Sequence, residues 1–203
     1  MGTVLRLTSQ SEKSHRNVQS RMRVKEYLTD AEVERLMEAA TKGRHGVRDR
    51  LLILLAWRHG LRVSELVGMC LAQVNIPARE VYVRRVKGSE SNHHPLLEDE
   101  IKLLNRWLAL RTTLKGAGSA RLFLNERGEG MHPHAFNHLL AVIGKRAGFT
   151  CAIYPHLLRH SCGYHLAGKG LNAFTIAAYL GHANLQNSLR YVHASAYSFQ
   201  GVW

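Results

Sequence analysis

The sequence predicts an α+β fold that is mainly helical and contains one small antiparallel sheet. Most of the chain divides into segments with helix start and stop signals, whereas residues 80–87 alternate in the manner of a strand. Helices come first, then the short β region, then helices again, which is not the repeating order of a parallel α/β protein. The 203 residues suit one large domain, or one domain with a short arm.

The first helices have clear boundaries. Ordered structure is expected to begin at "YLTDAEVERLMEAA", where Thr29 and Glu32 have the spacing of a capping box. The next helix is expected in "VRDRLLILLAWRHG". Its wide apolar content predicts deep burial, and Gly60 suits the position after its last turn. A short helix is then predicted within "LRVSELVGM".

The β region follows. "EVYVRRVK" alternates at Val81, Val83 and Arg85 and is predicted to be a strand, which "KGSESNHH" then turns. "HPLLE" leads into a helix over "EDEIKLLNRWLALR". We expect "RLFLN" to be a short buried segment.

Four helices complete the expected fold. "HPHAFNHLLAVIGKRAG" has Pro133 in its first turn and Gly148 at its end, as helices commonly do. The other three are expected at about residues 156–168, 172–180 and 184–193.

The two ends of the chain are expected to differ from the domain between them. Residues 1–26 are rich in basic residues with little apolar periodicity, which predicts a flexible basic arm; a leader with no role is the alternative. Residues 27–203 are expected to form one domain. Its tail, "VHASAYSFQGVW", is apolar enough to dock on the domain itself or on a neighbouring copy.

Composition restricts the partner and the compartment. Lys plus Arg is 28 and Asp plus Glu is 15, a formal charge of +13, and a domain this basic usually meets a polyanion. The three cysteines form neither a disulfide framework nor a CxxC pair. The longest apolar run is too short to cross a bilayer, and the start of the chain lacks an apolar signal region. We therefore expect a cytoplasmic protein on DNA or RNA; a ribosome-associated or merely basic protein is the alternative.

Histidines four residues apart raise the question of a metal. His156 and His160 share a helix face, as zinc ligands do in HExxH sites, but Leu157 stands where that motif has Glu. "HPHAFNH", with His132, His134 and His138, would supply further ligands only by coincidence. The sequence therefore predicts no metal and no other cofactor. Arg159 lies on the same helix, and a buried arginine beside histidines needs an anion.

Cutting a phosphodiester without a metal requires a particular set of side chains. Fixed arginines bind the non-bridging oxygens, and histidines add hydrogen bonds. A nucleophile attacks in line, and the leaving 5′-oxygen needs a proton donor. Tyrosine suits a reversible reaction because its phosphodiester keeps the bond energy for rejoining. The chain offers such a set: Arg62, Lys87, His156, Arg159, His182 and Tyr191.

Around these residues the chain resembles the tyrosine recombinases, the phage-integrase-type enzymes. "HGLRVSEL" is similar to their first arginine motif, and "HLLRH" to their H-x-L-R-H box. "YLGH", followed nine residues later by Tyr191, is similar to their final histidine-to-tyrosine box, and "VKGSESNHHPL" lies where they have a β-hairpin lysine. Within the family, "LRHSCGYHLA" and the ending "FQGVW" most resemble the small fimbrial phase-variation invertases.

The resemblance implies a role for each position. Arg62 and Arg159 would hold the scissile phosphate, and His156 and His182 would hydrogen-bond it, with His156 a candidate acceptor of the tyrosine proton. Tyr191 would form a 3′-phosphotyrosyl link, and Lys87 would protonate the leaving oxygen. Glu65 matches an acidic supporting position, and His160 is expected to orient and pack. Arg84, Arg85 and Lys87 are expected to reach DNA, and Tyr179 and Tyr197 are the rival tyrosines.

The resemblance also implies a function. It is that of a site-specific recombinase that inverts a promoter-bearing segment between inverted-repeat sites in double-stranded DNA. Four copies would assemble at synapsis, with DNA-bending accessory proteins as candidate helpers, in the cytoplasm on the nucleoid. Most family members have a separate core-binding domain, whereas here only the short arm is expected. Two alternatives stay open: relaxation of DNA by a type IB topoisomerase, and a non-catalytic DNA-binding regulator.

Overall fold

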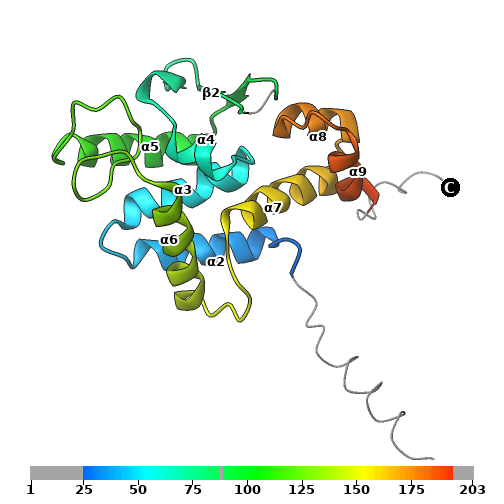
Figure 1. Ribbon diagram of the computed structural model, residues 1–203, viewed down its shortest axis with the longest axis horizontal. Helices are drawn as coiled ribbons and strands as arrows, with labels where there is room; N and C mark the ends of the chain where they lie inside the picture. The colour runs from blue at the N-terminus through cyan, green and yellow to red at the C-terminus, as the bar shows by residue number, and fades with distance from the viewer. Residues whose placement is uncertain (1–24, 87–88, 194–203) are drawn as a thin grey trace, which may run out of the picture.

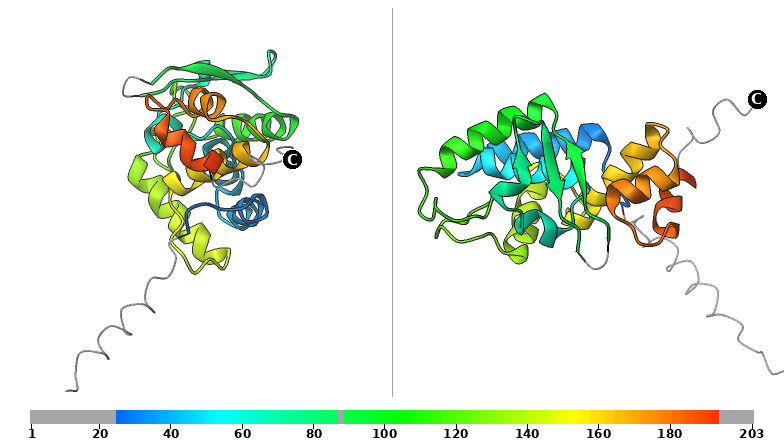
Figure 2. Two further views of the ribbon diagram at one scale, coloured as in Figure 1. Left: turned by 90° about the vertical axis from the view of Figure 1, so that its right-hand side faces the viewer. Right: turned by 90° about the horizontal axis from the view of Figure 1, so that it is seen from above.

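The computed structural model describes residues 25–86 and 89–193, which form a mainly helical molecule with a small sheet across one side (Figures 1 and 2). The predicted arm, apart from its last two residues, and the apolar tail beyond residue 193 lie outside the described residues. The helices are α2 (Asp30–Thr41), α3 (Gly46–Arg58), α4 (Val63–Val67), η1 (Leu71–Gln73), α5 (Glu98–Arg111), α6 (Pro133–Arg146), α7 (Pro155–Gly168), α8 (Ala173–Leu180) and α9 (Gln186–His193). No helix in this part of the chain is long and apolar enough to span a membrane.

The predicted antiparallel sheet is present, but it is built from three strands. β2 (Glu80–Val83) lies between β1 (Val74–Asn75) and β3 (Asn92–Pro95), and both pairings are antiparallel. The sequence predicted only the central strand. The prediction that "KGSESNHH" is all turn was wrong for its last three residues, which belong to β3. Neither edge strand carries a run of β-branched or aromatic residues, so only pairing with β2 makes these segments extended.

The predicted helix boundaries follow from local chemistry. Thr29 caps α2, its backbone N–H donating to Glu32 Oε2 at 2.9 Å while Glu32 N–H donates to the threonine hydroxyl at 3.3 Å. The capping box is therefore confirmed. Gly60, after the end of α3, has φ +55°, and Gly181, after α8, has φ +65°. Glycine adopts this left-handed conformation without the steric cost that a Cβ imposes, so both helices stop sharply.

Most of the apolar side chains form one large cluster, here called the main core. It takes buried residues from α2 through α6, from the sheet and from the first half of α7. α3 runs through it and packs against α2, α5 and α7. Residues 51–56 of α3 are all less than 4% exposed, so the predicted deep burial of this helix is confirmed.

A second, smaller cluster lies at the C-terminal end of the described chain. This C-terminal cluster consists of Cys162, Ala167, Ile176, Leu180 and Tyr191. α7 joins the two: in Figure 1 it leaves the main body and reaches α8 and α9 at the right-hand end. Leu157 and Leu158 belong to the main core and Cys162 to the C-terminal cluster, so Arg159 and His160 lie where the two meet.

Candidate active site

A pocket of about 200 Å³ opens where α4, α7 and α9 meet the turn after α8. Five of the six predicted catalytic residues line it together with His160, and the sixth, Lys87, lies outside the described residues. The structure adds two residues that sequence reasoning missed, Asn187 and Arg190. Asn187 stands four residues before Tyr191 on α9, a spacing that places both on one helix face. The full lining is Arg62, His156, Arg159, His160, His182, Asn187, Arg190 and Tyr191.

Arg62 is fixed by the start of α4. Its backbone is extended and caps the helix, and Glu65, in the first turn, accepts the Arg62 backbone N–H at 2.9 Å. The other Glu65 oxygen lies 2.6 Å from Arg62 Nη1. Burial raises the pKa of Glu65, but the hydrogen bonds from Arg62 and the charge of Arg85 outweigh it, so the pKa falls below its ordinary value. Glu65 is therefore a carboxylate that orients Arg62, in agreement with the supporting position expected for it.

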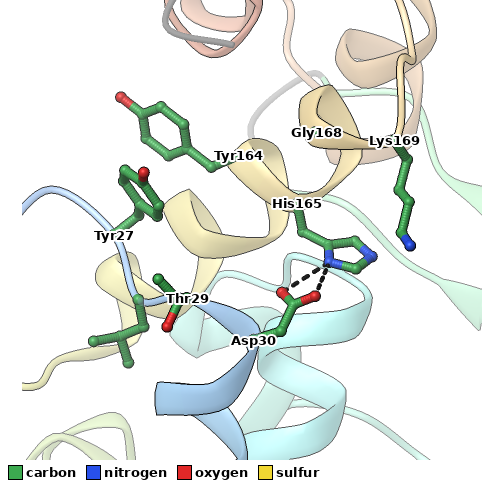
Figure 3. Close-up of a pocket in the computed structure, with 8 residues that line it drawn as sticks. Tyr27, Thr29, Asp30, Tyr164, His165, Gly168 and Lys169 are labelled. Carbon is green, nitrogen blue, oxygen red and sulfur yellow. Dashed lines mark hydrogen bonds and ion pairs between the residues drawn. The ribbon is translucent and has the colours of Figure 1, made fainter. Parts of the chain in front are cut away.

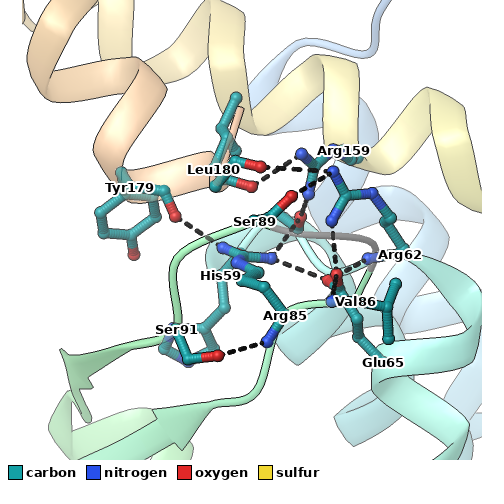
Figure 4. Close-up of polar contacts among 12 residues, drawn as sticks. His59, Arg62, Glu65, Arg85, Val86, Ser89, Ser91, Arg159, Tyr179 and Leu180 are labelled. Atoms are coloured by element: carbon teal, nitrogen blue, oxygen red, sulfur yellow. Dashed lines mark hydrogen bonds and ion pairs between the residues drawn. The ribbon is translucent and has the colours of Figure 1, made fainter. Parts of the chain in front are cut away.

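Arg159 forms the floor of the pocket and is 2% exposed. Its guanidinium donates to the carbonyl oxygens of Gly60 and of Leu180, the latter at 2.7 Å (Figure 4). Burial, then the charges of Arg62 and Arg85, lower the pKa of Arg159 to about 10. The group stays protonated at neutral pH. It is a buried cation with donors fixed at the base of the pocket, which suits an anionic ligand.

The histidines of the pocket are neutral in the free protein. His182 Nδ1 lies 2.7 Å from the hydroxyl of Ser188, a contact that fixes the ring and leaves Nε2 for another partner. Burial, then the charges of Arg159 and Arg62, lower the pKa of His182 to about 4. Burial and then Arg159 also lower the pKa of His156, which stands at the exposed rim. A neutral imidazole can donate from one nitrogen and accept at the other.

Tyr191 is 1% exposed, and its hydroxyl lies 2.9 Å from His160 Nδ1. Gly163 on α7 makes room for the ring, because a Cβ there would stand 2.6 Å from the ring carbons. Burial raises the pKa of Tyr191 to about 12, against the opposing charge of Arg159. The resting side chain is a protonated phenol. His160, expected to orient and pack, contacts the hydroxyl directly, whereas His156 was the expected proton acceptor.

The three basic residues expected to reach DNA differ in their positions. Arg84 is exposed. The prediction that Arg85 faces DNA was wrong, because its side chain is fully buried and ion-paired with Glu65 at 2.8 Å. The alternation noticed in the sequence already contained the signal, since Val81, Val83 and Arg85 all point inward although β2 ends at Val83.

The rings of His156 and His160 meet edge to face, with centroids 4.4 Å apart. Within residues 25–86 and 89–193, no three histidine, cysteine, aspartate or glutamate side chains are grouped as metal ligands would be. The pair is instead part of the arginine-lined pocket.

A second pocket, of about 380 Å³, lies between the start of α2 and the end of α7 (Figure 3). His165 Nδ1 lies 2.9 Å from the Asp30 carboxylate on its wall, and the rings of Tyr27 and Tyr164 stack with centroids 4.0 Å apart. Tyr164 also meets the ring of Tyr191 edge-on at 5.1 Å. This pocket contains none of the predicted site residues, but Tyr164 on its wall contacts Tyr191, the candidate nucleophile.

Comparison with known proteins agrees with this site. The sequence profile of the Phage integrase family matches residues 26–197. The type 1 fimbriae regulatory proteins FimB and FimE of Escherichia coli K12 are each 37% identical to the chain, over 87% of it and 88% of FimB, and over 90% of it and 92% of FimE. A crystal structure of XerA recombinase matches with a TM-score of 0.75 at 26% identity. That match covers 87% of this chain and 63% of the XerA chain, so the chain spans less than two thirds of that structure.

A mainly helical fold with a three-stranded sheet, and arginines and a tyrosine around one pocket, define the catalytic domain of a DNA breaking-and-rejoining enzyme that uses tyrosine. The chain belongs to the phage integrase family, the tyrosine recombinases. Its function class is therefore site-specific DNA recombination, and DNA is its partner. The predicted family, fold class and enzyme class are confirmed.

Proposed function

We propose that the chain inverts a promoter-bearing DNA segment by cutting and rejoining strands through a 3′-phosphotyrosyl intermediate made with Tyr191. The observation that carries the proposal is the convergence of Arg62, Arg159 and Tyr191 on one pocket within a single chain. Arg62 stands at the start of α4, Arg159 on α7 and Tyr191 on α9. They belong to separate helices, and a pocket with several guanidinium groups and a phenol suits phosphoryl transfer.

Arg62 and Arg159 bind the non-bridging oxygens of the scissile phosphate, and His156 and His182 donate hydrogen bonds to it. Tyr191 Oη forms a bond to phosphorus as the bond from phosphorus to the 5′-oxygen breaks. Lys87 gives the leaving oxygen its proton. Rejoining reverses these steps, with the 5′-hydroxyl of the exchanged strand as the nucleophile.

The phenol proton leaves along the contact that already exists, to His160 Nδ1 at 2.9 Å. In the free protein burial, then the charges of His156 and Arg190, lower the pKa of His160 to about 4, which makes it a poor base. An anionic phosphate between the guanidinium groups would offset part of that positive charge and raise the histidine pKa. The base therefore becomes effective when DNA is bound.

Inversion is the outcome we propose because of the relatives. FimB and FimE are named as regulators of type 1 fimbriae, and they match this chain over most of both lengths. A regulator that is also a recombinase can act by reversing a promoter between inverted repeats. Exchange of two duplexes needs four cuts, so four copies are proposed at synapsis, with DNA-bending proteins as helpers, on the nucleoid in the cytoplasm. Arg84 is proposed to contact DNA phosphates, and the net charge of +13 is proposed to attract the DNA backbone.

Covalent capture tests the chemistry. Sheared genomic DNA of the source organism, nicked and incubated with the protein, is expected to yield protein joined to 3′ ends, and sequencing the captured DNA identifies the site. A nicked duplex with that site then compares variants. Tyr191→Phe is expected to bind the duplex without forming the adduct, whereas Tyr197→Phe, the matched control, forms it. An adduct that survives in Tyr191→Phe, or that disappears when divalent metals are chelated, would contradict the proposal.

A plasmid assay separates the remaining functions. A supercoiled plasmid with two captured sites in inverted orientation is expected to show a reversed restriction pattern. A topoisomerase would instead relax a plasmid that lacks the sites. A non-catalytic regulator would bind the sites and leave no covalent product.

A further inference from the structure

The end of α8 is held by arginines in an unusual way. The last carbonyl groups of a helix have no partners within the helix. Here the three successive carbonyls of residues 179–181 each accept from a different guanidinium group: Arg85, Arg159 and Arg62, in that order (Figure 4). Two of these arginines line the pocket, and the third does not.

Arg85 has no access to a ligand of the pocket or to DNA, because its side chain is fully buried. Its guanidinium nevertheless shares hydrogen-bond partners with both Arg62 and Arg159. It donates to Glu65 Oε2 at 2.8 Å, to the His59 carbonyl at 3.1 Å and to the Gly60 carbonyl at 3.3 Å. The Gly60 carbonyl also accepts from Arg159.

Glu65 connects Arg85 directly to Arg62. One carboxylate oxygen lies 2.6 Å from Arg62 Nη1, and the other is shared by the Arg62 backbone N–H at 2.9 Å and Arg85 Nη1 at 2.8 Å. The side chain of Glu65 is 1% exposed, so solvent cannot replace a lost partner. The position of the Arg62 guanidinium therefore depends on where Arg85 holds this carboxylate.

The turn after α8 is closed over the same side chain. Gly181 has φ +65°, and a Cβ at this position would lie 2.9 to 3.0 Å from three atoms of the Arg85 side chain. Only glycine fits a backbone this close to its neighbour. His182 follows immediately, so Arg85 contacts the segment from which His182 enters the pocket.

We propose that Arg85 is a positioning residue that sets Arg62 and the turn before His182 at the distance a phosphate needs, an inference that rests on the proposed function. The planar fork of a guanidinium can serve a carboxylate and several carbonyls at once. A lysine ammonium, a single point on a flexible stem, cannot hold the same partners in place. A displacement of about 1 Å in a catalytic group can reduce a rate about 100-fold.

The test compares two buried arginines. Arg111 on α5 is 3% exposed and donates to the carbonyls of Ala117, Ser119 and Arg121, none of which lines the active-site pocket. Arg85→Lys and Arg111→Lys both keep their charge and both lower Tm. With saturating protein and the nicked duplex, Arg85→Lys is expected to form the covalent adduct about 10- to 100-fold more slowly than wild type, and Arg111→Lys at the wild-type rate.

A second substrate distinguishes positioning of Arg62 from general damage. In a methylphosphonate duplex a methyl group replaces one non-bridging oxygen of the scissile linkage. The linkage is then neutral, so its cleavage depends less on the positive charge of a guanidinium. The deficit of Arg85→Lys is expected to shrink several-fold on this duplex, and the same is expected of Arg62→Ala. Glu65→Gln gives the same pattern and serves if Arg85→Lys does not fold.

Equal deficits on both duplexes, or a wild-type rate in a folded Arg85→Lys, would overturn the positioning role. Equal deficits on both duplexes, or a wild-type rate, in a folded Glu65→Gln would also overturn it. Absence of any adduct with the wild-type chain would instead refute the proposed function and is seen before any variant is compared.

Discussion

The main core and the C-terminal cluster are stabilised by different forces. The main core buries apolar side chains of α2, α3, α5 and α6 in a single large cluster. The C-terminal cluster has five fully buried apolar members, and one of them is Tyr191 itself. The arginines that bond to the end of α8 supply contacts that apolar packing supplies elsewhere.

The difference bears on the local stability of α8 and α9. Segments with few buried apolar contacts open at lower free energy than the body of a protein. Here α8 and α9, which flank the turn with His182, are those segments, and α9 carries Tyr191. Arg159 and Arg62 also donate to the carbonyl groups of Leu180 and Gly181, so they connect the end of α8 to α7 and to the start of α4.

The largest expected effect is on the main core. Phe136→Ala removes a fully buried ring and is expected to lower the free energy of unfolding by about 3–5 kcal/mol. Urea denaturation followed by circular dichroism measures it. Val142→Ala, on the same helix but 41% exposed in the native protein, is the control and should change little. A small loss in Phe136→Ala would mean that α6 is not part of the stabilising core.

The next effect tests the C-terminal cluster. Gly163→Ala places a methyl group where the Tyr191 ring lies, so the ring must shift. We expect adduct formation to fall about 100-fold with little change in the unfolding of the main core. Gly168→Ala on the same helix, whose Cβ would meet nothing within 4 Å, is the control. Equal rates for the two variants would show that the ring position is not critical.

Acid is expected to weaken the boundary between α8 and the sheet. His94 on β3 packs on Tyr179 with centroids 4.0 Å apart, and burial, then the charges of His59 and Arg85, lower its pKa to about 3. The unfolded chain binds this proton near pH 6.5, whereas the folded chain does not. Stability is therefore complete above pH 6.5 and falls as the pH drops towards 3, by on the order of 2 kcal/mol at pH 4.5.

Urea denaturation at pH 7 and pH 4.5 measures this loss, and His94→Gln should reduce the difference between the two pH values. His160 and His182, with pKa values of about 4, add a loss of the same sign. An unchanged pH dependence in His94→Gln would show that His94 is not the group responsible.

The smallest effect concerns the cap of α2. Thr29→Ala removes the side-chain acceptor of the capping box and is expected to cost about 1 kcal/mol. The midpoint of thermal unfolding should fall by a few degrees. Thr41→Ala, at the last residue of the same helix, is the control, and a larger loss there than at Thr29 would contradict the capping argument.

Local signals explain which parts of the fold were predictable. Capping residues, glycines after helices and one alternating strand identified the helices and the centre of the sheet. β1 and β3 were missed because their residues have little preference for strands, and their extended form depends on a partner distant in the chain. Arg85 was expected to reach DNA because it stands beside Arg84 and Lys87, although the alternation already put it on the inner face.

The sequence by itself determined the family, the mainly helical fold and the residue types of the site, because ordered motifs and helix signals are written locally in the chain. Only the tertiary structure decided that Arg85 is buried between Glu65 and α8, that the Tyr191 hydroxyl meets His160, and that Asn187 and Arg190 join the pocket. These contacts join residues from separate elements, and their distances are set by how two unequal clusters pack around α7 rather than by any local pattern.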